Sequence, residues 1–142
     1  MTDFEIPCYA FSARHASRHL SQFYERKVIA SGLHSQQFTI LAIIKRKGPL
    51  TVVELAEELA MDRTTLARSL QPLERDGVIS IASGQKDRRL KIISITADGI
   101  IQLDAALILW RQAQAEFESR FGTERAAKLR EELKAAAQAV TD

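Results

Sequence analysis

The segment from residue 62 to 75 places polar and basic side chains along one side of an expected helix. At about 100° per residue, Leu66, Leu70 and Leu73 share one face, which must be buried. Polar residues on the other sides of the same segment include Arg63, Thr64, Thr65, Arg68, Gln71 and Arg75. Arginine can form two hydrogen bonds with guanine, and Thr or Gln can bond base edges in a major groove. Taken alone, this face is equally typical of a helix surface in solvent.

A second group of basic residues follows shortly afterwards. Lys86, Arg88, Arg89 and Lys91 surround the single acid Asp87, so four cations minus one anion give a local net charge of +3, against +2 for the whole chain. A basic turn of this kind can contact phosphates or enter a narrow minor groove, where the negative potential attracts arginine. The alternative is a solubilising loop, which a basic turn on its own would favour.

The elements that must hold these residues can be inferred from caps and breakers. Apolar residues recur at helical spacing from 9 to 23, and Gly32 separates this first helix from a second that Ser35 is expected to cap. Thr51 and Glu54 form a capping-box pattern that opens a short helix ending near Met61. Asp62 is then expected to cap a helix that runs to about Arg75. Two short helices joined by a tight turn indicate a helix-turn-helix.

The period changes after residue 77. The β-branched segments 78–81 and 90–95 flank the polar segment 82–89, which predicts a hairpin. Thr96 is expected to cap a long helix to about Phe121, and Thr123 to cap a last one after Gly122. The order helix, helix, basic hairpin favours DNA binding over the solubilising-loop alternative.

Composition restricts the class of protein. The 142 residues suit one globular domain, with 46% hydrophobic and 27% charged residues and one cysteine. No apolar run approaches a membrane span, and the N-terminus lacks a basic segment followed by an apolar one, so we expect a cytoplasmic protein without a membrane partner. The chain carries no phosphate-binding loop, catalytic-triad pattern or zinc spacing, so we expect neither an enzyme, a metal site nor a cofactor.

Several motifs together resemble the MarR family of bacterial transcription regulators. They are the segments 55–56, 62–68, 73–79 and 87–89, and 95–99 at the hairpin exit. The family's wing pattern has an Asp, one residue and an Arg, then a strand ending in Leu-Thr and a nearby Gly. Asp87, Arg89, Thr96 and Gly99 match it, with Ile95 in place of Leu.

The resemblance implies a mainly α fold with a small β-hairpin. It implies a single domain over residues 1–142, in which 33–96 form a winged helix-turn-helix lobe and 1–32 and 97–142 form dimerisation helices. It further implies a homodimer that binds a pseudo-palindromic operator in double-stranded DNA and acts as a repressor that a signal releases. Arg89 would enter the minor groove and Asp87 would orient the wing.

The dimer also has support from the residues themselves. Leu103, Leu107, Ile108, Leu109 and Trp110 form an apolar surface wider than one small helical core can cover. A second copy would bury it and supply a second recognition helix about 34 Å away. Trp110 could equally belong to the core of one chain.

Pro72 departs from an ordinary recognition helix. It lacks the N–H that would bond the carbonyl of Arg68 and crowds that carbonyl. We expect a bend or a tightened last turn, which would leave the half from Asp62 to Arg68 intact for base contacts.

Two kinds of signal are open. Cys8 follows Pro7 and is expected in the first turn of a helix, where the partial positive charge favours the thiolate. This placement resembles the organic-hydroperoxide-sensing branch of the family, with a resolving thiol from outside the chain, although Cys8 could also be a small interface residue. The other signal is a small aromatic acid, for which the conceivable lining residues are Arg14, His15, His19 and Gln37.

One alternative belongs to another class. A winged helix can serve as a protein-interaction module without specific DNA binding. Such a module would not need to keep Lys86, Arg88, Arg89 and Lys91 together, so the basic wing favours DNA.

Overall fold

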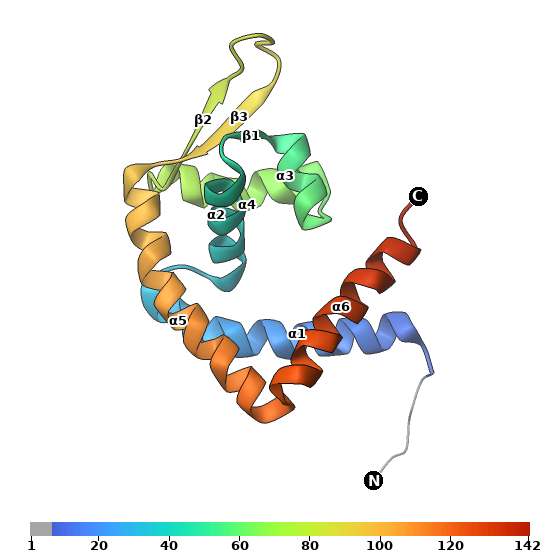
Figure 1. Ribbon diagram of the computed structural model, residues 1–142. Coiled ribbons are helices and arrows are strands. Elements are labelled where there is room, and N and C mark those ends of the chain that lie inside the picture. Colours follow the sequence, from blue (N-terminus) through green and yellow to red (C-terminus); the bar gives the residue numbers. More distant parts are fainter. Residues whose placement is uncertain (1–6) are drawn as a thin grey trace.

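The computed structural model describes residues 7–142, and Figure 1 shows the arrangement of its elements. The elements in chain order are α1 (Tyr9–Val28), the 3-10 turn η1 (Ile29–Ser31), α2 (Ser35–Lys47), β1 (Leu50–Thr51), α3 (Val52–Leu59), α4 (Arg63–Arg75), β2 (Ile79–Ser83), β3 (Lys91–Ile95), α5 (Ala97–Phe121) and α6 (Thr123–Ala139). The expected mainly α fold with a hairpin is confirmed.

The sheet has three strands in the order β1-β3-β2, all antiparallel. Ile81 lies opposite Ile93 in the hairpin, and Leu50 pairs with Ile93 from the other side. The sequence analysis missed β1, because two residues are too few to show the alternation of apolar and polar residues that marks a strand. They form a strand only through this pairing. The sheet thereby ties the start of α3 to the wing.

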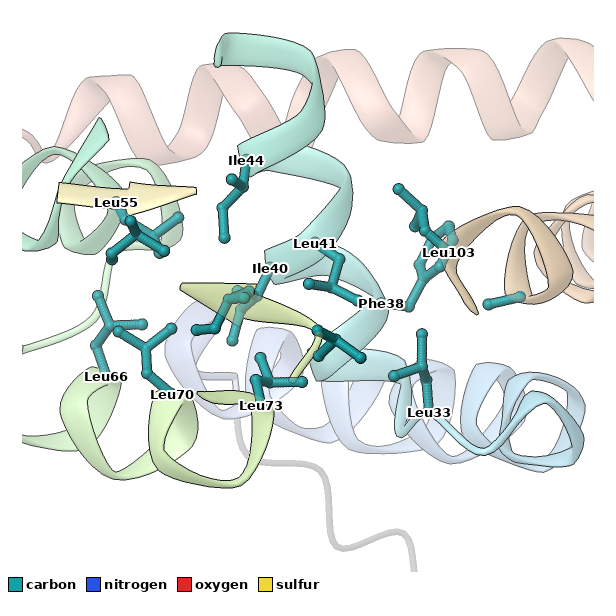
Figure 2. Packing of buried hydrophobic residues seen from close by; sticks show 14 of the residues in the cluster. Leu33, Phe38, Ile40, Leu41, Ile44, Leu55, Leu66, Leu70, Leu73 and Leu103 are labelled. Atoms are coloured by element: carbon teal, nitrogen blue, oxygen red, sulfur yellow. The ribbon is translucent and has the colours of Figure 1, made fainter. Parts of the chain in front are cut away.

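A hydrophobic core joins α2, α3, α4 and the sheet into one unit, which we call the lobe (residues 33–96). The largest fully buried side chains of the lobe are Ile40, Leu41, Ile44, Leu55, Leu66, Leu73 and Ile93. Figure 2 shows the leucines of α4 pointing toward Ile40 and Leu55 from the neighbouring helices. The face of α4 that is rich in leucine is therefore buried, as its period predicted.

The remaining helices α1, η1, α5 and α6 form what we call the frame. In Figure 1, α5 descends from the base of the hairpin, crosses α1 and turns sharply into α6. Trp110 of α5 stacks on Phe38 of α2, with ring centroids 5.8 Å apart, so it belongs to the contact between frame and lobe within one chain. The frame holds residues 7–32 and 97–142; residues 1–6 of the expected first segment lie outside the described residues.

Two expected caps are wrong. His34, and not Ser35, precedes α2 in extended backbone, and its N–H donates to Gln37 Oε1 at 2.9 Å. Thr123 is the first residue of α6 and not its cap, because Gly122 occupies the preceding position with a φ of 102°. Among the described residues, no helix combines the length and hydropathy that crossing a membrane requires.

Candidate nucleic-acid interface and sensor residues

The predicted recognition helix α4 begins at a side-chain cap. Asp62 accepts from the backbone N–H of Thr65 at 2.8 Å and from its hydroxyl at 2.7 Å. These hydrogen bonds hold the pKa of Asp62 below its ordinary value. The Thr65 hydroxyl hydrogen is thus already engaged, which leaves Arg63, Thr64 and Arg68 as the free donors of the first two turns.

All six residues predicted for base contacts are exposed. They are Arg63, Thr64, Thr65, Arg68, Gln71 and Arg75. Arg75 pairs with its neighbour Asp76 at 3.4 Å, at the C-terminal end of the helix. The N-terminal half of α4 therefore presents the least encumbered side chains, which agrees with the half expected to enter the groove most deeply.

Pro72 does not end the helix. The helix continues to Arg75 and closes at Gly77, which has a φ of 76°. Gly77 N–H donates to the Glu74 carbonyl and Val78 N–H to the Leu73 carbonyl, both at 3.0 Å. This is the tightened last turn expected from the sequence, and a left-handed glycine completes it.

The wing is organised by one acid. Asp87 Oδ1 accepts from the backbone N–H of Arg89 at 3.0 Å and from its Nε at 3.1 Å, while Oδ2 accepts from Nη2 at 3.1 Å. These bonds hold the pKa of Asp87 below its ordinary value. The Arg89 side chain remains 90% exposed despite the fork, so its guanidinium is held in place and still accessible.

The other predicted wing residues, Lys86 and Arg88, are exposed. Within residues 7–142, Arg89 alone among the basic residues of the wing has an ion-pair partner. Among the described residues, the wing therefore carries exposed cations without an ion-pair partner, suited to phosphates, beside one oriented arginine. Figure 1 shows the tip of the hairpin projecting beyond the helices of the lobe, on the side away from α1 and α6.

The predicted sensor residues do not form one site. Cys8 is exposed and precedes α1 at the N-cap position, not inside the first turn as expected. His15 and His19 lie one turn apart on α1, with ring centroids 4.6 Å apart, and both are exposed, as is Arg14. Gln37 is occupied at the start of α2, where it accepts from the His34 N–H.

A groove of about 1040 Å³ lies elsewhere, between α1, α2, α5 and α6. Its polar lining includes Ser17, Tyr24, Gln114 and Arg130, and none of the four residues predicted for an aromatic acid lines it. Tyr24 donates to Gln114 Oε1, and burial together with the nearby Glu118 charge raises the pKa of this phenol. The groove combines hydrogen-bonding groups and one cation with apolar walls, a lining that suits an anion with an apolar body.

Comparison with known proteins decides the family. The family model described as the MarR family matches residues 31–90. The M. tuberculosis transcriptional regulator MosR, solved in complex with DNA, is 38% identical, and the alignment covers 93% of this chain and 97% of MosR with a TM-score of 0.80. The chain belongs to the MarR family.

Two curated relatives share shorter segments with this MarR-family chain. The transcriptional activatory protein BadR of Rhodopseudomonas palustris is 31% identical over 77 residues, which are 52% of this chain and 44% of BadR. The organic hydroperoxide resistance transcriptional regulator of Bacillus subtilis is 27% identical over 92 residues, which are 65% of this chain and 63% of that protein. The chain therefore spans less than two thirds of either relative. Both are named as transcription regulators and not as enzymes, which is the class that the sequence predicted.

Sequence reasoning missed the groove of this MarR-family protein for a physical reason. Tyr24 and Gln114 are 90 positions apart in the chain and meet only because α1 crosses α5. Arg130 comes from a third helix, whose placement depends on the turn at Gly122. No short motif carries such a constellation, whereas Asp87 and Arg89 belong to one loop and could be found.

Proposed function

We propose that this chain is a sequence-specific DNA-binding transcription regulator. The observation that carries the proposal is that the exposed polar face of α4 and the oriented Arg89 of the wing belong to one lobe with a continuous core. A rigid lobe can place one element in a major groove while the wing reaches the adjacent minor groove. MosR, to which this chain aligns over 93% of its length, was solved in complex with DNA.

The regulator would act as a homodimer on a pseudo-palindromic operator. Within residues 7–142, several large apolar side chains of the frame are strongly or half exposed: Tyr9 (94%), Phe11 (43%), Ile108 (60%), Leu133 (50%) and Val140 (83%). A second copy, packed through these helices around a twofold axis, would bury them and bring two recognition helices to one operator. In this proposal the lobe (33–96) binds DNA, and 1–32 and 97–142 form the dimer.

A repressor that a signal releases is the regulatory mode we propose, acting in the bacterial cytoplasm where the DNA lies. The oxidant form of the signal would use Cys8, whose exposed thiol sulfur a hydroperoxide can oxidise to sulfenic acid while it is itself reduced to an alcohol. The ligand form would use the groove with Tyr24, Gln114 and Arg130, which receives an aromatic carboxylate more readily than the exposed Arg14, His15 and His19.

The decisive experiment measures fluorescence anisotropy on the DNA upstream of the protein's own gene and on duplexes selected from a random pool, at two salt concentrations with competitor DNA. We expect binding that survives competitor and weakens with salt as phosphate contacts require. Arg89→Ala should bind about tenfold more weakly, while Arg111→Ala, an exposed arginine of the frame, should bind like the wild type.

Failure to select any duplex would favour the second function considered for this fold, a winged-helix protein-interaction module. Equal affinity of Arg89→Ala and the wild type would remove the wing from the DNA contact. Sedimentation of the free protein tests the dimer separately, because a monomer at micromolar concentration would contradict it.

The signal is tested on the same DNA complex with cumene hydroperoxide and with benzoate. If Cys8 is the sensor, the hydroperoxide should release the wild type and not Cys8→Ser. If the groove is the sensor, benzoate should release both proteins and fail to release Arg130→Gln. Equal release of wild type and Cys8→Ser by the hydroperoxide would exclude Cys8 from the mechanism.

A further inference from the structure

The chain crosses between frame and lobe twice, once near Gly32 on the way in and once at Thr96 on the way back. The second crossing lies where α4, the hairpin and α5 meet. Thr96 follows β3 and precedes α5, and it is half-buried at the end of the wing. Thr96 is thus the single residue that connects β3 of the wing to α5 of the frame.

Four hydrogen bonds converge on Thr96, one of which its carbonyl accepts from Ile100 N–H at 3.0 Å in the first turn of α5. Its hydroxyl donates to the Gly77 carbonyl at 2.6 Å and accepts from Gly99 N–H at 3.0 Å. Its backbone N–H donates to the Val78 carbonyl at 3.1 Å. One residue thus joins the turn that closes the recognition helix to the first turn of α5.

The same contact leaves no space for movement of α5 toward this turn. A Cβ added at Gly99 would lie 2.1 Å from the Val78 carbonyl oxygen and 2.8 Å from Ile95 Cγ1. Gly99 has no need of glycine's conformational freedom, since it lies in α5 with an ordinary helical φ. Its role is the close approach of two backbones, which locks α5 against the end of α4.

Other contacts between frame and lobe are of a different kind. Lys45 of α2 approaches Asp104 of α5 at 3.5 Å with both side chains about half exposed, and Phe38 stacks on Trp110. An exposed ion pair of this type contributes little, and stacked rings can slide over one another. The Thr96 hydroxyl bonds backbone groups of the turn after α4 and of the start of α5, whereas the comparable hydroxyl of Ser31 bridges Val28 and Leu33 at the first crossing.

We infer that Thr96 is a positioning residue that sets the spacing of the two recognition helices, and so the distance between operator half-sites that the dimer accepts. The inference rests on the proposed dimeric DNA-binding function. Because α5 belongs to the frame that the dimer shares, a change in its angle to α4 is carried to both lobes. One base pair of extra spacing moves a half-site by about 3.4 Å and rotates it by about 34°. If the contact at Thr96 keeps α4 and α5 in a fixed orientation, the dimer should bind more weakly when one base pair is added between the half-sites.

The experiment uses the full-length protein and an operator selected by the wild type from random duplexes, together with versions that have one base pair inserted or removed at the centre. Thr96→Val removes both bonds of the hydroxyl. Thr96→Asp keeps an acceptor for Gly99 N–H, as a good helix cap does, and loses only the donation to the Gly77 carbonyl. Thr96→Ser retains both. Thr39→Val is the matched control, because this hydroxyl bonds the Ser35 carbonyl at 3.1 Å within α2 and joins no second element.

The wild type, Thr96→Ser and Thr39→Val should prefer the selected spacing about tenfold over either altered duplex. Thr96→Val and Thr96→Asp should lose most of this preference, so that the three duplexes bind within about threefold of each other. The ratio cancels any uniform loss of affinity, including the effect of the added charge of Asp. An unchanged ratio in Thr96→Asp would overturn the inference and leave the proposed function intact.

A measurement without DNA distinguishes failure of the proposed DNA-binding function from failure of the inference about Thr96. Spin labels at Ser80→Cys in a Cys8→Ser background report the distance between the two lobes of a dimer, since Ser80 is exposed on β2. Thr96→Asp should broaden this distance distribution, and Thr96→Ser should not. If the wild type selects no duplex, the proposed function fails while this distribution still decides the role of Thr96. Identical distributions, or a wild type that is monomeric, would overturn it.

Discussion

The two crossings between frame and lobe differ in chemistry, although each contains a hydroxyl that bridges backbone groups, Ser31 at the first and Thr96 at the second. At the first crossing a carboxylate holds the start of α2: Glu25 Oε1 accepts from Ser35 N–H at 2.8 Å, and Oε2 lies 2.9 Å from Nδ1 of His34, whose side chain is 63% exposed. At the second crossing, backbone groups and one hydroxyl meet around Thr96 with no titratable group among the hydrogen-bonding partners.

The difference indicates which of the two crossings can change its geometry more easily. The flexible, partly exposed side chains of Glu25 and His34 at the first crossing can rearrange with the loss of side-chain hydrogen bonds alone, and no two backbone segments are in close contact there. Gly32 there has a φ of 91°, and an added Cβ would meet only the end of the flexible Gln102 side chain, at 2.9 Å. Gly99 at the second crossing would meet a carbonyl oxygen instead. We therefore expect the first crossing to tolerate change and the second to resist it.

The largest expected effect is that of Gly99→Ala. Its methyl group cannot fit beside the Val78 carbonyl without moving α5, so the free energy of unfolding should fall by about 3 kcal/mol, as for overpacked sites. Urea unfolding at one fixed protein concentration measures it. Gly77→Ala is the control, because its φ of 76° carries the strain of a left-handed alanine with no atom within 4 Å. Equal losses in the two variants would show that close approach at Gly99 does not matter.

Thr96→Val should lower the free energy of unfolding by about 1.5 kcal/mol, since it loses two hydrogen bonds at a half-buried position where water can replace part of them. Thr96→Ser should lose less than a third of that. Thermal unfolding of both variants checks the expectation. If Ser were as damaging as Val, the methyl group and not the hydroxyl would be the stabilising part.

Gly32→Ala tests the tolerant joint. The left-handed conformation costs an alanine about 1 kcal/mol, and Gln102 can swing away from the added methyl group. Urea unfolding should therefore show a loss close to that of Gly77→Ala and well below that of Gly99→Ala. A loss as large as that of Gly99→Ala would remove the distinction between the two crossings.

Glu25→Gln should have the smallest effect, about 0.5 kcal/mol at pH 7, because its contacts with His34 and Ser35 are partly exposed to solvent. Partial burial raises the pKa of Glu25, but hydrogen bonds from His34 and the Ser35 N–H outweigh it, and the pKa lies below the ordinary value of 4.5. A lowered carboxyl pKa stabilises the fold above the unfolded pKa, and this contribution is lost as the pH falls through the folded value.

The difference between wild type and Glu25→Gln in urea unfolding should accordingly shrink once the pH falls below 4.5. Glu74→Gln, at an exposed acid of α4 with no ion-pair partner within residues 7–142, should leave the free energy of unfolding at pH 7 unchanged. A difference that stays constant down to pH 3 would contradict the role given to the Glu25 carboxylate.

Much of the fold followed from local signals. Thr51, Asp62 and Thr96 cap the helices that the sequence analysis assigned to them, because a cap and its partner lie within three residues. The caps proposed at Ser35 and Thr123 were wrong by one residue, since His34 and Gly122 take the positions that the backbone required. The wing pair Asp87 and Arg89 was found because both residues belong to one short loop.

The sensor residues show where such reasoning stops. Arg14, His15 and His19 share the exposed side of α1, as their spacing allowed, but the groove opens elsewhere. Its residues come from helices that meet only in the folded chain. A prediction based on residue type alone had no signal for Gln114 or Arg130.

The sequence by itself determined the caps, the leucine face of α4 and the charge of the wing, because each of these depends on residues within about one or two turns of each other. Only the tertiary structure decided that β1 is a strand, that Tyr24 meets Gln114, and that Thr96 and Gly99 bind α5 to the end of the recognition helix. Those features need segments far apart in the chain to approach within hydrogen-bond distance. Packing of the whole core fixes that approach, and no local spacing encodes it.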